Sequence, residues 1–191
     1  MYPFPARSSA SIVQATTLTS EKVDLTASPE PTAVQYQFLI RPFGQPTATP
    51  IRVTSPTPTI DVEGLKPGQA YTATVVAITA AGQQTPAGNA IAFTMPVQSA
   101  PTLIAADATG PTQGKLSAVP PKTGGPWKSY TFTVTPRDGG APTIVTCPTL
   151  DCMVEGLTPA TAYDVTVAAS SQSGTKSPAS NSLSMVTPAA G

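Results

Sequence analysis

Two cysteines are the residues of this 191-residue chain whose type and spacing point most directly to chemistry. Cys147 and Cys152 bound the segment Cys-Pro-Thr-Leu-Asp-Cys. Two interpretations are open, a local disulfide or a pair of buried thiols, and we favour the disulfide. Because the closed loop would be short, we expect it to stabilise the fold by at most ~2 kcal/mol. A disulfide also implies an oxidising compartment, and therefore an extracellular or cell-surface location.

The remaining residues offer little for catalysis or metal binding. The chain has no histidine, which excludes Ser-His-Asp and Cys-His systems and leaves the cysteines without partners for a zinc site. The nearest carboxylate pairs, Asp61 with Glu63 and Asp151 with Glu155, are interpreted as solvated charges. No glycine-rich phosphate loop opens a helix. We therefore expect no enzymatic activity, no catalytic residue, and no metal or cofactor.

The segment Arg137-Asp138-Gly139-Gly140 holds the residue types of an integrin-type Arg-Gly-Asp loop in a different order. Asp-Gly-Gly is typical of a hairpin turn. We interpret the segment as a turn between two strands and not as a binding motif.

Composition favours short strands joined by turns. The 23 prolines and 14 glycines disfavour helices, and alternating stretches such as Tyr163-Asp-Val-Thr-Val-Ala argue against disorder. Charged residues make up only 10% of the chain and the formal net charge is zero, so nothing indicates nucleic-acid binding. No apolar run is long enough to predict a membrane span. The first residues, MYPFPARSSASIVQ, lack the basic and apolar regions of a secretory signal.

One phrase occurs twice in the chain. Residues 62–77 read VEGLKPGQAYTATVVA and residues 154–169 read VEGLTPATAYDVTVAA, with ten of sixteen positions identical. Further upstream the offset of 92 residues becomes 94, as between Tyr36 and Tyr130, so a two-residue length change falls in a turn. The repeat is far longer than a solenoid unit, and it predicts two separate domains, residues 1–96 and 97–191.

Each copy holds seven strand-like runs separated by turn residues, which predicts an all-β fold of two seven-stranded β-sandwiches. In the first copy we expect strands near residues 10–16, 21–27, 34–41, 50–54, 58–63, 70–79 and 88–94. In the second copy we expect strands near residues 101–107, 114–119, 128–135, 142–146, 150–155, 162–170 and 180–186.

The repeated phrase has the residue types of a sandwich corner. Gly64 and Gly156 allow a sharp turn, and Tyr71 and Tyr163 then open the next strand, where we expect each hydroxyl to bond upstream backbone as a tyrosine corner. The pattern G-L-x-P-x-x-x-Y-x-x-x-V-x-A, followed by Ser/Thr-Pro, resembles a fibronectin type III domain over nearly the whole chain. It is carried by Gly64, Leu65, Pro67, Tyr71, Val75, Ala77 and Thr85-Pro86, and again by Gly156, Leu157, Pro159, Tyr163, Val167, Ala169 and Ser177-Pro178.

The chain departs from this family at one core position. The family usually carries a tryptophan on its second strand, where this sequence has Ala27 and Ala118. The one tryptophan, Trp127, opens the third strand instead. Losing a large ring costs a few kcal/mol unless other side chains fill the space, and we expect Phe38 and Phe132 to do so.

The resemblance implies a non-catalytic structural or adhesive extracellular module. The short, proline-bounded linker at residues 95–101 predicts a stiff two-domain rod, a segment or subunit of a cell-surface, wall or filament assembly. We expect protein partners or self-association. Residues 47–50 and 55–59 are rich in Thr, Ser and Pro, which is typical of O-glycosylated loops. Their prolines equally fit protection of strand edges from pairing with other chains.

Two alternative functions stay open at this stage. The chain could be a spacer in a larger secreted, carbohydrate-active enzyme, a role that fibronectin-like pairs take by resemblance. It could also be a receptor-type module that binds a protein, which needs exposed aromatic side chains. Phe43 and Trp127 are the candidates for such a surface contact, together with Tyr2 and Phe4.

Overall fold

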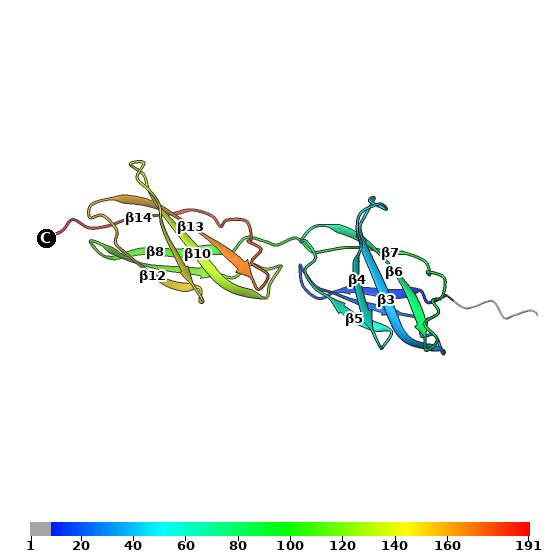
Figure 1. Ribbon diagram of the computed structural model, residues 1–191. Coiled ribbons are helices and arrows are strands. Elements are labelled where there is room, and N and C mark those ends of the chain that lie inside the picture. The colour runs from blue at the N-terminus through cyan, green and yellow to red at the C-terminus, as the bar shows by residue number, and fades with distance from the viewer. Residues whose placement is uncertain (1–8) are drawn as a thin grey trace, which may run out of the picture. The chain divides into compact units, whose positions relative to one another are not determined.

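The structure is a computed structural model, and it describes residues 9–191. Within these residues it contains fourteen strands and no helix, and the chain divides into two compact units between Val97 and Gln98. Each unit consists of two layers of strands, and the loop between its third and fourth strands projects beyond the sheet (Figure 1). The expected all-β fold of two seven-stranded sandwiches is confirmed.

The first unit packs a three-stranded sheet against a four-stranded one, with every strand pair antiparallel. Its strands are β1 (Ile12–Thr17), β2 (Val23–Ala27), β3 (Ala33–Pro42), β4 (Ile51–Ser55), β5 (Thr59–Val62), β6 (Ala70–Thr79) and β7 (Ile91–Thr94). The sheet orders are β1-β2-β5 and β4-β3-β6-β7.

The second unit repeats this topology. Its strands are β8 (Thr102–Gly110), β9 (Gln113–Val119), β10 (Trp127–Pro136), β11 (Thr143–Cys147), β12 (Asp151–Glu155), β13 (Ala162–Ser171) and β14 (Leu183–Val186). The sheet orders are β8-β9-β12 and β11-β10-β13-β14. Pairing registers also repeat, since Phe38 lies opposite Val53 and Val75, and Phe132 lies opposite Val145 and Val167.

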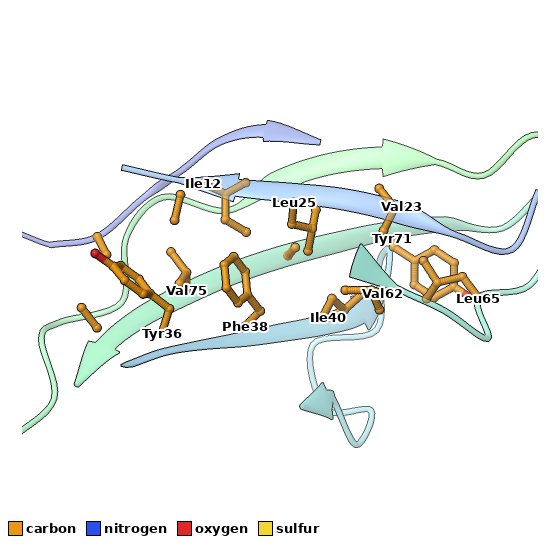
Figure 2. Close-up of a cluster of buried hydrophobic side chains, with 14 of the residues drawn as sticks. Ile12, Val23, Leu25, Tyr36, Phe38, Ile40, Val62, Leu65, Tyr71 and Val75 are labelled. Atoms are coloured by element: carbon orange, nitrogen blue, oxygen red, sulfur yellow. The ribbon is translucent and has the colours of Figure 1, made fainter. Parts of the chain in front are cut away.

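The strand periodicity places one face of each sheet in a core. Tyr163, Val165, Val167 and Ala169 are buried along β13, whereas the residues between them are partly exposed. Figure 2 shows the core of the first unit, with Tyr36 at one end of the cluster, Tyr71 at the other and Phe38 between them.

The alanines that stand where the family carries tryptophan lie in these cores. Ala27 and Ala118 are both buried. Phe38 and Phe132 are fully buried, one in each core, so each sandwich closes around a phenylalanine from its third strand.

The last strand of each unit begins three residues later than the sequence suggested. Upstream of it, the backbone N–H of Thr85 donates to the Ala77 carbonyl (2.9 Å), while Ala77 N–H donates to the Thr85 hydroxyl (3.0 Å). Ser177 exchanges the same two bonds with Ala169, at 2.8 and 2.9 Å. A side-chain oxygen therefore replaces a backbone carbonyl as acceptor, and this segment is held to the sheet without being a regular strand.

Candidate functional site

The two corner tyrosines make the same hydrogen bond in each unit. The Tyr71 hydroxyl accepts a hydrogen bond from the backbone N–H of Lys66 (2.9 Å), and the Tyr163 hydroxyl accepts one from Thr158 (2.7 Å). Both side chains are buried. Each bond satisfies a backbone donor five residues upstream, so each tyrosine fixes the turn that precedes its own strand.

The end of each corner differs in one residue. Gly68 has φ of 71° and donates its N–H to the Pro96 carbonyl (3.2 Å). The equivalent Ala160 has φ of 50° and donates to Pro188 (3.1 Å). The left-handed backbone conformation is easy for glycine and costly for alanine. The alanine at position 160 therefore gave no indication in the sequence that the backbone is left-handed there.

Cys147 and Cys152 form a disulfide with a Cα–Cα distance of 6.0 Å. It joins β11 to β12, which belong to opposite sheets. In the first unit the position of Cys147 is taken by Ser55, whose hydroxyl donates to the Thr59 carbonyl (2.9 Å) and accepts from Thr57 N–H (3.1 Å). The same connection is thus closed covalently in one unit and by a hydroxyl in the other.

The candidate carboxylates lie at the surface. Lys22 Nζ lies 2.8 Å from Asp61 Oδ2 and 3.3 Å from Glu63 Oε1, and the hydrogen bond to Asp61 raises the pKa of Lys22. Asp151 is exposed and accepts a hydrogen bond from the Ser117 hydroxyl (2.5 Å). Each carboxylate therefore has the solvent contact of an ordinary surface charge.

Among residues 9–191, no three His, Cys, Asp or Glu side chains are grouped so that they could hold a metal ion. Nor does that range contain a helix of the length and apolarity needed to cross a membrane.

The Arg137–Gly140 segment is a turn, as its sequence indicates. Gly139 has φ of 90°, and Gly140 N–H donates to the Asp138 carboxylate (3.2 Å). Arg137 Nε lies 2.9 Å from Asp164 Oδ1, and this contact raises the pKa of Arg137 and lowers that of Asp164. The arginine is engaged with the neighbouring strand and is not displayed by the loop.

The candidate surface aromatics differ from one another. Phe43 is 58% exposed at the start of the loop after β3. Trp127 is only partly exposed and packs against the core, and a Cβ added to Gly124 would lie 2.7 Å from its ring. The tryptophan ring is thus partly covered by its own unit beside Gly124, and its role as a surface contact stays a prediction. Tyr2 and Phe4 lie outside the described residues.

Two polar side chains with structural roles were missed by sequence reasoning. The Asn181 amide accepts from the N–H of Leu103 and donates to its carbonyl, both at 3.0 Å, and so ties the segment before β14 to β8. The buried Thr187 hydroxyl accepts from Thr161 N–H (3.0 Å) and donates to the Thr158 carbonyl (2.6 Å) at the tyrosine corner. The recurrence of asparagine at positions 89 and 181 was the one available signal.

Comparison with known proteins gives one family match and several structural neighbours. Residues 99–186 match the family model of the fibronectin type III domain. A two fibronectin type-III domain segment from chicken tenascin is 18% identical over 94% of this chain and 100% of its own, with a TM-score of 0.48. The chicken CNTN1 FN1–FN3 domains are 17% identical over 93% of this chain and 64% of their own, with a TM-score of 0.45. No curated protein matches by sequence. The second unit therefore matches the fibronectin type III family, and the first unit repeats its sheet topology and pairing registers.

Proposed function

We propose that the chain is a non-catalytic structural or adhesive module of the cell surface or extracellular space, which acts by spacing and surface contact. Tandem fibronectin type III domains are typical of extracellular and adhesive proteins. The Cys147–Cys152 disulfide supports this location, because disulfides persist mainly in oxidising compartments. Exposed threonines on its proline-rich loops, Thr47, Thr49 and Thr57, offer attachment points for O-linked glycans.

The observation that carries the proposal is the set of hydrogen bonds that each unit forms with the chain on its side of residues 97 and 98. In the first unit, Met95 N–H donates to the Gln69 carbonyl (3.0 Å). Gly68 N–H donates to the carbonyl of Pro96 (3.2 Å). The chain is therefore bonded to its corner up to residue 96.

The second unit forms hydrogen bonds with the chain from Ser99 onward. Ser99 N–H donates to the Thr123 carbonyl (3.2 Å), and Thr123 N–H donates to the Ser99 hydroxyl (2.9 Å). Only Val97 and Gln98 lie between Pro96 and Ser99 in the chain, and Gln98 is already buried at 9% exposure. So short a connection supports a stiff spacer, since a free linker of several residues is what lets domains move independently.

The proposal is tested by NMR relaxation of the isotope-labelled chain under dilute, monomeric conditions. We expect one common rotational correlation time for both units. A control variant with four Gly-Ser residues inserted between Val97 and Gln98 should give two faster, separate values. If the unaltered chain behaves like this control, the spacer proposal is wrong.

A further inference from the structure

The four-stranded sheet of the first unit carries positive charge that no carboxylate offsets. No Asp or Glu occurs in residues 31–60 or 64–106, which supply all four strands of this sheet. Arg41 and Arg52 belong to its β3 and β4. Neither forms a salt bridge with any residue in the described range.

Both arginines lie on the outer face of that sheet. Phe38 and Ile40 are buried in the core, so Leu39 and Arg41, which alternate with them along β3, face outward. Arg52 lies directly opposite Leu39, which places it ~7–8 Å in Cα distance from Arg41 across the diagonal. We call Arg41, Leu39 and Arg52 the basic patch: a partly exposed apolar side chain with one arginine beside it on its own strand and one across from it on the next.

The second unit carries the opposite pattern on an edge strand. Along β12, Cys152 and Val154 are buried, whereas Asp151, Met153 and Glu155 face outward and are exposed. We call these last three residues the acidic ridge. Met153 is 49% exposed, and the two carboxylates stand ~13 Å apart along the strand.

Other charges on this sheet face leave the ridge acidic. Lys115 lies opposite Met153 on β9, and Asp107 lies opposite Lys115 on β8. The lysine is thus offset by Asp107, and the two ridge carboxylates remain. Strand β12 pairs only with β9, so its outer side is an open sheet edge.

We propose that the basic patch of one copy docks on the acidic ridge of a second copy of this chain. Each surface has an apolar side chain next to two like charges, and the signs of the two surfaces are opposite. Charge pairing at the rim and a Leu39–Met153 contact at the centre follow the ordinary arrangement of a protein interface. A second copy fits better than a polyanion, because a polyanion would leave both apolar side chains unused.

The contact joins two different surfaces of the chain, so it is either exchanged reciprocally between two copies or repeated from copy to copy along an assembly. This inference rests on the proposed structural function and names the partner for it.

The test is sedimentation velocity of the full chain over a range of concentrations in low salt. We expect concentration-dependent growth that weakens by about tenfold or more in high salt, because exposed charges are screened. Arg41→Glu with Arg52→Glu, and separately Asp151→Lys with Glu155→Lys, should each abolish growth. Mixing these two double variants should restore it, because each then meets a surface of opposite charge.

A matched control makes the same change of net charge elsewhere, through Lys122→Glu with Lys176→Glu at two exposed lysines, and should leave association unchanged. A chain that stays monomeric at every concentration overturns the inference, as does a control that loses association equally. Variants that fail to complement each other overturn the patch–ridge pairing.

Binding of polyglutamate without self-association would show that the partner is an acidic polymer and not a second copy, and so would also overturn the inference. The NMR relaxation experiment uses monomers and does not depend on self-association. Its result therefore tests the spacer proposal separately from this inference.

Discussion

At the scale of the residue, one alanine occupies a backbone conformation that its counterpart fills with glycine. Ala160 has φ of 50° where Gly68 has φ of 71°, and both donate to a proline carbonyl. The left-handed region costs an L-residue roughly 1–2 kcal/mol, so the second corner is strained at this position.

We predict that Ala160→Gly stabilises the second unit by up to ~1 kcal/mol, because relief of the left-handed alanine outweighs the added freedom of the unfolded chain. The melting temperature should rise by roughly 4–8 °C per kcal/mol. Trp127 is the one tryptophan of the chain and packs in this unit, so its fluorescence reports the transition. A lower melting temperature would refute the assignment of strain.

Tyr130 gives a second prediction, in pH dependence. Burial raises the pKa of its hydroxyl above the ordinary value of 10.0. The folded state therefore holds this proton more tightly than the unfolded state does. The resulting stability is fully present below pH ~10 and is lost as the pH rises through the folded pKa. In denaturant unfolding followed by Trp127 emission, Tyr130→Phe should show a smaller alkaline loss of stability than the unaltered chain. Equal losses in both would contradict the prediction.

At the scale of the element, each corner depends on one hydroxyl that satisfies a backbone donor. Tyr163→Phe leaves the Thr158 N–H without its 2.7 Å acceptor, and we expect a loss of about 1–3 kcal/mol. The matched variant Tyr71→Phe makes the same change in the first unit. It should leave the transition seen by Trp127 unaltered, and a shift there would mean that the units do not unfold separately.

Removal of the disulfide can be tested with a variant that copies the equivalent residues of the first unit. Replacing Cys147 by Ser and Cys152 by Ile reproduces the residues of the first unit, Ser55 and Ile60. We expect a loss of ~2 kcal/mol or less, because the closed loop is short and the hydroxyl can take over the turn. Urea unfolding of the second unit measures it, and a much larger loss would show that the disulfide does more than close a local connection.

These elements show what sequence reasoning can and cannot reach. Alternation and turn residues predicted fourteen strands, because burial of one sheet face leaves a period of two in the sequence. The late start of β7 and β14 was not predictable, since it depends on hydroxyls of Thr85 and Ser177 acting as backbone acceptors. The partial burial of Trp127 was not predictable for a similar reason, because its packing depends on the conformation of Gly124 and Gly125. The ion pair of Arg137 with Asp164 joins residues far apart in the chain.

At the scale of the whole molecule, the repeat produces two cores that share no residue. All members of one core lie in residues 10–95, and all members of the other lie in residues 103–185. We predict that residues 1–97 and 98–191, expressed separately, each give a β-type circular dichroism spectrum and a cooperative melt. The separated second half should melt within a few degrees of its transition in the full chain. A half that is unstructured alone would contradict the division into self-sufficient units.

The hydroxyls that hold the last strands also bear on covalent modification. Thr85 and Ser177 each precede a proline, as Thr49 and Thr57 do, yet both side chains are buried and engaged with the sheet. A modifying enzyme could reach these two hydroxyls only in the unfolded chain, and a bulky group there would keep the last strand from docking. On the folded protein they are closed to modification, whereas Thr49 and Thr57 are exposed.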